Sequence, residues 1–411
     1  MVLTEEAQKE ARRIKERLKR KGVKIIDDTR SRIKKPEVKV KKPKPHYNNQ
    51  STSKVDPSKF KEFHYYLQDS GFLIDSDISL KFNIEEEEPI DDAGECTIKL
   101  AKEAYNPNLT FTIITALLQN TSLISFGPPG SGKTSASEFV ISGMYNIPMS
   151  EIQEATIQGN PELTEEKMLA YISLSSFIDH KEKIGVRKFM TSPGRIIDEV
   201  NRMPPSKSSL LLRILDNGWA TYNDKKIKAT QGPLFATANG IDPGTYEMTP
   251  PFLDRFDIGI IKAELDPYFI EFYTSSRNNK IRSLEDKIIQ PPRSITSEDI
   301  MNARKEIYFN TYIESELMNK VAHFLAESLS CDKAGKDIQR KTKGHAMKKS
   351  PGPLCKDCRY YNNDMNICKE TGNGLGARTI SSLYAYSKAL SWWRGNQKVE
   401  EDDIKYALMY T

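Results

Sequence analysis

Residues 127–134, GPPGSGKT, have the types and spacing of a phosphate-binding loop. The stretch fits the pattern G-x-x-x-x-G-K-[ST] at every fixed position. An apolar run at 122–126 precedes it, as a buried parallel strand would, and residues 133–144 have the pattern of a helix. A glycine-rich turn formed by chance is the alternative, but the flanking strand and helix favour a nucleotide site. The loop residues expected to bind the nucleotide are Gly127, Pro128, Pro129, Gly130, Ser131, Gly132, Lys133 and Thr134.

The chemistry of such a loop gives each part of the stretch a task. Glycines let the backbone turn tightly and point its N–H groups inward, where they bind phosphate oxygens together with the positive end of the following helix. Lys133 is expected to reach the β- and γ-phosphates, and the Thr134 hydroxyl is expected to ligate Mg²⁺. The sequence therefore predicts ATP and Mg²⁺ as cofactors, although nothing in the loop chooses adenine over guanine.

A second group of candidate residues lies in the string RIIDEVNR at 195–202. Apolar residues that end in Asp-Glu are what a second core strand supplies to a phosphate-loop site. Asp198 is expected to hold Mg²⁺ through water, and Glu199 to polarise the water that attacks the phosphate. This pair is a weak signal alone, but its place about 65 residues after Lys133 makes it a strong one.

Two further polar residues follow predicted elements. Asn239 comes directly after an apolar strand at 233–238, where a side chain of an open α/β sheet touches the ligand. The alternative is an asparagine that only starts a turn. The string PFLDRFD at 251–257 places the charged Arg255 beside a hydrophobic anchor.

The elements that must position these residues follow an α/β pattern. Helices are expected over 99–119 and 206–217. The remaining elements are a second strand region at 149–158, a helix at 165–180 before a basic link at 181–188, and a hairpin at 218–230 around Asn223-Asp224.

The chain divides into four parts by composition. Residues 1–58 are expected to form a basic N-terminal helix and a disordered linker, and residues 59–98 a lead-in segment. Residues 99–290 form the nucleotide-binding core, and 291–411 an all-helical lid with a cysteine-rich insertion at 331–371.

Charge is concentrated at the start of the chain. Residues 1–58 hold 18 Lys/Arg against 8 Asp/Glu, whereas the whole chain has a formal net charge of +5, so the remainder is net acidic. This arm could contact nucleic acid or another polyanion, or it could be a solvated tail. No aromatic residues interleave with its charges, which argues against a specific nucleic-acid site.

Bulk composition sets the class of protein. Charged residues make up 28% of the chain and hydrophobic ones 38%, which is typical of a soluble globular protein. No apolar run approaches the ~20 residues of a membrane span, and no signal sequence is expected at the N-terminus. Five cysteines, four of them close together, fit a reducing cytoplasm and a metal site better than disulfides.

The cysteine-rich insertion has the composition of a structural zinc site. Its four thiols lie within about 40 residues, with one tight C-x-x-C pair, and are Cys331, Cys355, Cys358 and Cys368. An iron–sulfur cluster and unligated cysteines are the alternatives, and His345 could replace Cys331 as a ligand. The insertion is also basic, with 10 Lys/Arg and 5 Asp/Glu over 331–371, and could grip a partner or simply stabilise the lid.

Read in chain order, six strings resemble one family. GPPGSGKT, IQGNPEL, IIDEVNRMPP, FATANG, PFLDRFD and GLGART are similar to the MoxR branch of the AAA+ ATPases over roughly residues 99–411, apart from the cysteine insertion. The resemblance implies a P-loop NTPase αβα sandwich with a parallel sheet, a smaller helical lid, and a homo-oligomeric ring that is usually a hexamer. It also implies that ATP hydrolysis remodels or matures other proteins, often beside a partner with a von Willebrand factor A-type domain.

The resemblance further implies a role for each matching position. These positions are Lys133 and Thr134 of the Walker A motif, Asp198 and Glu199 of the Walker B motif, Asn239 that orients the lytic water, Arg255 as the arginine finger that reaches the neighbouring subunit's γ-phosphate, and Arg378 as the lid's phosphate-sensing arginine. An arginine from a neighbour neutralises charge that develops on the phosphoryl oxygens and links hydrolysis to assembly.

This chain departs from the family pattern in three features. The family usually has four apolar residues before Asp-Glu, whereas here only Ile196 and Ile197 separate Arg195 from Asp198. Either the strand is short or the loop before it is trimmed. The basic N-terminal arm and the cysteine insertion also lie outside the pattern.

The sequence thus predicts an oligomeric, Mg²⁺-dependent AAA+ ATPase that remodels a macromolecular partner, with protein favoured. A nucleic-acid-associated motor stays open because the arm and the insertion are basic, and a steep salt dependence of stimulation by DNA or RNA would distinguish it. A nucleotide-switched scaffold is a third possibility, against which Glu199 and Arg255 count. A GTPase of the restriction-motor type, which shares the Asp-Glu-x-Asn-Arg string, is a weaker one.

Overall fold

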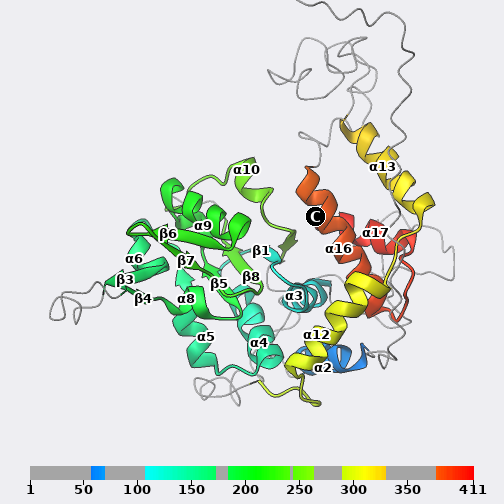
Figure 1. Cartoon of the computed structure of the whole chain (residues 1–411), viewed down its shortest axis with the longest axis horizontal. Coiled ribbons are helices and arrows are strands. Elements are labelled where there is room, and N and C mark those ends of the chain that lie inside the picture. The colour runs from blue at the N-terminus through cyan, green and yellow to red at the C-terminus, as the bar shows by residue number, and fades with distance from the viewer. Residues whose placement is uncertain (1–56, 70–106, 173–183, 241–243, 263–288, 330–375) are drawn as a thin grey trace, which may run out of the picture. The chain divides into compact units, whose positions relative to one another are not determined.

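The computed structural model describes part of the chain, all of it after Thr52 (Figure 1). The described ranges are 57–69, 107–172, 184–240, 244–262, 289–329 and 376–411. The N-terminal arm, most of the lead-in segment and the cysteine insertion with its four cysteines lie outside them. The predictions made for those segments therefore have no structural outcome.

A five-stranded parallel sheet forms the centre of the α/β fold, as the sequence predicts. Its order is β2 (Ile157–Gln158), β5 (Arg195–Asp198), β8 (Leu234–Ala238), β1 (Ser122–Phe126) and β9 (Ile258–Ile261). Every residue of β8 and all but the last of β1 are buried, because helices cover both faces of a parallel sheet.

The register of the strands brings the candidate residues to one edge. Phe126, the last residue of β1, pairs with Ala238, the last residue of β8. Ile197 of β5 pairs with Ala236, so Asp198 ends its strand at the same level. The phosphate-binding loop, the Asp-Glu pair and Asn239 therefore all leave the sheet at its carboxyl edge.

Alternate residues of the strands separate two hydrophobic clusters. On one face, Leu123 and Phe235 pack with residues of α3 (Pro107–Leu117) and α4 (Lys133–Tyr145). On the other face, Ile124 and Ala236 pack with residues of α9 (Pro205–Asn217). The first cluster also contains residues of the short N-terminal helix α2 (Ser58–Asp69), so this part of the lead-in segment packs against the core.

The C-terminal region is helical, as expected. Its elements are α12 (Ser297–Lys305), the π-helical turn η4 (Glu306–Asn310), α13 (Ser315–Leu329), α16 (Ala377–Trp393) and α17 (Glu401–Leu408). Trp393 and Tyr386 of α16 are fully buried in the same cluster as α3. The Tyr386 hydroxyl lies 2.8 Å from Thr115 Oγ1, which fixes α16 against α3.

Two secondary-structure predictions are wrong. The strand region expected at 149–158 is mostly helix α5 (Met149–Ala155), followed by the two-residue strand β2. Met149, Ile152 and Ala155 are buried at a helical spacing, which does not alternate as a strand would. The helix expected at 165–180 ends at Met168 of α6 (Glu165–Met168), and β3 (Ala170–Ile172) then pairs antiparallel with β4 (Ile184–Val186).

The expected hairpin is confirmed. Strands β6 (Trp219–Tyr222) and β7 (Lys225–Lys228) pair antiparallel. Asn223 and Asp224 both have positive φ angles, of 46° and 57°, which is what a two-residue hairpin turn requires. In the described part of the chain, no helix is long and apolar enough to span a membrane.

Candidate active site

The phosphate-binding loop connects β1 to α4 through three glycines with positive φ angles. These angles are 155° at Gly127, 80° at Gly130 and 75° at Gly132. A Cβ atom at Gly127 would lie 2.8 Å from the carbonyl oxygen of Lys262, so the close approach of these two backbones requires glycine. Nothing lies within 4 Å of where a Cβ atom would stand at Gly130 or Gly132, so the loop faces open space there.

Lys133 is buried and turns back onto the loop. Its Nζ donates to the carbonyl oxygens of Gly127, at 2.9 Å, and Pro128, at 2.8 Å. Burial lowers the pKa of Lys133, and the neighbouring Lys262 acts in the same direction while Asp198 opposes it. The buried Ser131 hydroxyl has no hydrogen-bond partner among the described residues. A phosphate in the loop would provide acceptors for both groups, so these residues fit a nucleotide.

One carboxylate oxygen of Asp198 receives two hydroxyl groups. Thr134 Oγ1 donates to Asp198 Oδ1 at 2.8 Å, and Thr237 Oγ1 donates to the same atom. Such oxygen donors suit Mg²⁺, which proteins usually hold with one or two side chains while phosphate and water complete the octahedron. The described residues contain no group of three or more His, Cys, Asp or Glu that could hold a metal, so Asp198 and Thr134 fit Mg²⁺ only together with a nucleotide.

Glu199 is held by three side chains from separate segments of the chain. Asn239 Nδ2 donates to its Oε1 at 2.5 Å, and Gln158 Nε2, from the end of β2, donates to its Oε2 at 2.9 Å. Arg202 Nε lies 3.4 Å from Oε2. Glu199 also has a left-handed backbone, with φ of 52°, and its N–H donates to Thr237 Oγ1 at 2.9 Å. Strained backbone of this kind is found where a side chain must be aimed.

Gly159 packs directly against the backbone of the turn that contains Glu199. Its N–H donates to the carbonyl oxygen of Asp198 at 2.7 Å. A Cβ atom at this position would stand 2.1 Å from the carbonyl oxygen of Glu199, which leaves no room for any side chain. No local sequence pattern assigns a role to Gln158, Gly159 or Thr237. Their position at the ends of β2 and β8, at the carboxyl edge, is the signal that could have found them.

The contacts of Arg195 explain why fewer apolar residues precede Asp198 than in the MoxR pattern. Arg195 is the first residue of β5 and is buried, with its Nη1 donating to Thr230 O at 2.7 Å and its Nη2 to Gly232 O at 3.1 Å. Burial lowers its pKa to about 10. The strand is therefore short in apolar residues because its first position holds a guanidinium that binds the carbonyl groups of the neighbouring loop.

Arg255 and Arg378 both contact Asp216, and they lie apart from Lys133 and Glu199. Arg255 Nε lies 3.2 Å from Asp216 Oδ2, and Arg378 Nη2 lies 2.7 Å from Asp216 Oδ1. Arg255 follows the short helix α10 (Pro250–Leu253), and its Nη1 donates to the Pro251 carbonyl oxygen. Within the described residues, no hydrogen bond or ion pair joins these arginines to Lys133 or Glu199.

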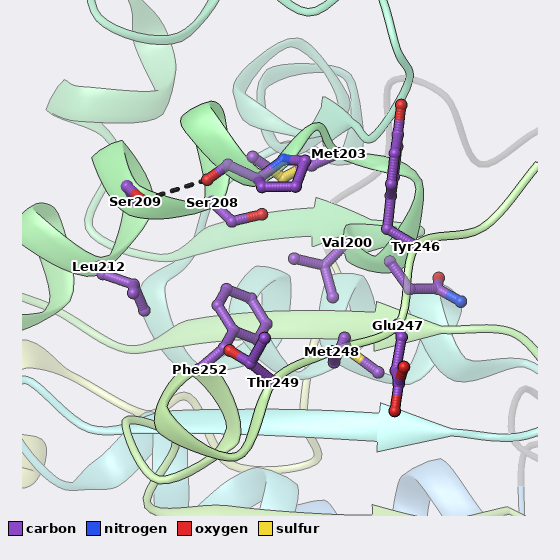
Figure 2. Close-up of a pocket in the computed structure, with 12 residues that line it drawn as sticks. Val200, Met203, Ser208, Ser209, Leu212, Tyr246, Glu247, Met248, Thr249 and Phe252 are labelled. Carbon is purple, nitrogen blue, oxygen red and sulfur yellow. Dashed lines mark hydrogen bonds between the residues drawn. The ribbon is translucent and has the colours of Figure 1, made fainter.

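An apolar cavity of about 260 Å³ lies beside the turn that follows Glu199. Figure 2 shows the side chains of Val200, Met248 and Phe252 directed toward the same space, with Leu212 of α9 at one side. Two hydrogen bonds link the lining of the cavity to the candidate site: Tyr246 N donates to Asn201 O at 2.7 Å, and the Asn201 side chain donates through Nδ2 to Asn239 O at 3.0 Å. The apolar lining of the cavity does not suit phosphate.

Glu138 on α4 gives the fold a measurable pH dependence. Burial, with a smaller contribution from Asp198, raises its pKa from 4.5 to about 7. Between these values the folded state binds a proton that the unfolded chain releases, so this group makes the unfolding free energy fall as pH rises through the interval. We expect the E138Q variant without nucleotide to be more stable than the wild type above pH 7, with the difference closing toward pH 4.5 in denaturant unfolding. Parallel pH profiles would contradict this.

Comparisons with known proteins agree with this geometry. Residues 122–256 match the family described as AAA domain (dynein-related subfamily). The fold is similar to the crystal structure of a protein from Cytophaga hutchinsonii described as a "putative ATPase", with a TM-score of 0.56 and 17% sequence identity, over 86% of each chain. No curated protein is similar enough to count as a match. The chain thus has an AAA+ α/β fold with a helical C-terminal region. The match of residues 122–256 to an AAA domain supports ATP hydrolysis as its activity.

Proposed function

We propose that this chain is a MoxR-like AAA+ ATPase that hydrolyses Mg²⁺-ATP between the subunits of a homo-oligomeric ring and uses the energy to remodel a protein partner. The observation that carries the hydrolytic part is the Glu199 carboxylate. It accepts hydrogen bonds from Asn239 and Gln158, and it directly follows Asp198, which accepts a hydrogen bond from Thr134. A pure nucleotide switch does not need an oriented base at this place.

Each group at the carboxyl edge then has a task. Lys133 exchanges its bonds to the loop carbonyls for bonds to the β- and γ-phosphates, which offer more negative charge. Mg²⁺, when bound, neutralises charge on the phosphates. Thr134 and Asp198 would hold the ion, and Glu199 would accept the proton of the attacking water while Asn239 keeps the carboxylate in place.

The position of Arg255 supports a ring. Its carbonyl oxygen accepts a hydrogen bond from Ser122 Oγ at 3.3 Å, and Ser122 is the first residue of β1. The phosphate-binding loop leaves β1 at the other end, after Phe126. Arg255 thus lies at the amino edge of the sheet, so a phosphate that it neutralises belongs to another subunit.

A nucleic-acid motor remains the second candidate because of the hairpin β6–β7. Lys226 and Lys228 are exposed on its outer face, and Lys226 Nζ lies 4.0 Å above the ring of Trp219. Lysines beside an aromatic ring are a common feature of surfaces that bind nucleic acid. A protein client, which the MoxR resemblance favours, must therefore be distinguished from nucleic acid by experiment.

The ATPase rate of the purified protein tests the proposal. We expect R255A to lower the turnover number by about 100-fold or more with ATP binding retained, whereas R213A, which removes an exposed arginine of α9, leaves it unchanged. Equal rates in R255A and R213A would contradict a ring enzyme. Stimulation by DNA or RNA that fades between low and moderate salt would select the motor instead.

Three finer assignments rest on the sequence alone. They are the zinc site at Cys331, Cys355, Cys358 and Cys368, the hexameric ring size, and a client that works beside a von Willebrand factor A-type domain. The thiols and their C-x-x-C spacing support zinc, and the resemblance supports the other two.

A further inference from the structure

Asp216 contacts both arginines that the sequence singles out. It lies near the C-terminal end of α9, one residue before the helix ends at Asn217. Its two carboxylate oxygens bind different partners, with Oδ2 at 3.2 Å from Arg255 Nε and Oδ1 at 2.7 Å from Arg378 Nη2. The two arginines lie 123 positions apart in the sequence, so a shared acid is not a consequence of local structure.

The segment around Arg255 also anchors the start of α16, which carries Arg378. The neighbouring Asp254 accepts a hydrogen bond from Thr379 Oγ1 at 3.4 Å, and Asp257 accepts one from Ser382 Oγ. Asp257 binds the backbone N–H of Ser122 as well, at 2.8 Å. The first turns of α16 are thus fastened to the amino end of β1 on both sides of Arg255.

This placement separates Arg378 from the nucleotide that its own chain binds. The contacts of α16 fix its start at the amino end of β1, whereas the phosphate-binding loop begins after the carboxyl end. Four residue steps of a strand span about 13 Å. Asp216 lies about 16 Å along α9 from the first residue of the helix, Pro205. Pro205 follows the turn at Glu199 closely in the sequence, so Asp216 lies at the end of the helix away from that turn.

We propose that Asp216 is a positioning residue that holds Arg255 and Arg378 as one cationic pair, and that a second copy of this chain presents its bound phosphates to this pair. The inference rests on the proposed function and adds that one carboxylate, that of Asp216, positions both arginines for the neighbour's nucleotide.

The charges of the group favour such a pair. Two guanidinium groups repel each other, and one carboxylate between them offsets this repulsion while leaving a net charge of +1 to meet a phosphate. Asp216 contacts one nitrogen of Arg378. Among the described residues, Asp216 is the only ion-pair partner of the Arg378 guanidinium. The Arg378 side chain is 49% exposed, so its remaining nitrogens can reach another molecule.

Steady-state kinetics of D216N test the positioning role. We expect the turnover number at saturating ATP to fall about tenfold, while KM for ATP and the thermal midpoint stay close to those of the wild type. D216E should restore most of the rate, because a carboxylate returns. The control is D224N, which removes one exposed acid in the next hairpin and should leave the rate unchanged. A wild-type rate in D216N would overturn the inference.

A variant that already lacks both arginines separates the positioning role of Asp216 from a nonspecific disruption of the structure. On a background that carries both R255A and R378A, D216N should lower the rate by less than twofold, because both residues that Asp216 positions are already absent. A further tenfold loss would contradict the proposal. If the wild type itself did not hydrolyse ATP, the proposed function would fail before this inference was reached.

Mixing two variants tests the side from which Arg378 acts. When R255A and R378A chains are mixed in equal amounts, no activity should return, because both variants lack a residue of the same donated pair. If Arg378 served its own nucleotide, an interface with an R255A phosphate site and an R378A donor would be complete. Recovery toward a quarter of the wild-type rate would therefore overturn the proposal.

Discussion

Replacing Glu199 by glutamine is expected to lower the rate of ATP hydrolysis by about 100-fold or more while leaving ATP binding unchanged. The amide has the size of the carboxylate and can still accept one of the two hydrogen bonds from Asn239 and Gln158, but it cannot accept the proton of the attacking water. The phosphate-binding loop, which lies on a different strand, keeps its groups. Single-turnover hydrolysis and equilibrium binding of ATP, measured on the same preparation, separate the two effects.

The matched control is E162Q, which removes an exposed carboxylate near the same edge of the sheet. Its rate should equal that of the wild type. If E199Q kept more than about a tenth of the wild-type rate, Glu199 would not be the base, and the hydrolytic mechanism argued from its contacts would be wrong.

Replacing Gly159 by alanine is the second change with a large expected effect. The new Cβ atom would stand 2.1 Å from the carbonyl oxygen of Glu199, so the turn that aims Glu199 must move. Overpacking of this kind typically lowers the unfolding free energy by about 1–3 kcal/mol. Displacement of the base by an ångström can cost about 100-fold in rate, so we expect hydrolysis to fall more than stability alone explains.

Gly259 provides the control for this change. It lies in β9 of the same sheet, and a Cβ atom there would meet Ile124 and Phe126 at 3.8 Å, an ordinary contact distance. G259A should therefore retain the rate and nearly all the stability. Denaturant unfolding and ATPase rates of both variants test the prediction, and a G159A protein with wild-type kinetics would refute the packing argument.

Local sequence patterns are sufficient to predict the central part of the fold. The loop glycines, the apolar strands β1 and β8, and the Asn223-Asp224 turn each follow from rules that act over a few residues. The carboxyl edge then follows from topology, because parallel strands that alternate with helices end on the same side. Hence the placing of Lys133, Asp198, Glu199 and Asn239 at one edge could be predicted.

Contacts between distant segments could not be predicted. Gly159 is required by a backbone oxygen 40 positions away, and Asp216 meets Arg378 across 162 positions. No periodicity carries such information. The strand expected at 149–158 failed for a different reason, since a short apolar run is compatible with both a strand and a helix until its packing is known.

In the proposed ring, one subunit completes the hydrolytic site of the next, and a mixture of E199Q and R255A chains measures whether it does. Each variant alone should be nearly inactive. In a mixed ring, an R255A subunit with an intact Glu199 can receive Arg255 from an E199Q neighbour, which should make about a quarter of the interfaces complete. Recovery toward a quarter of the wild-type rate is the predicted result. A mixture as inactive as its components, although shown to co-assemble, would mean that Arg255 does not act on the neighbouring subunit's phosphate.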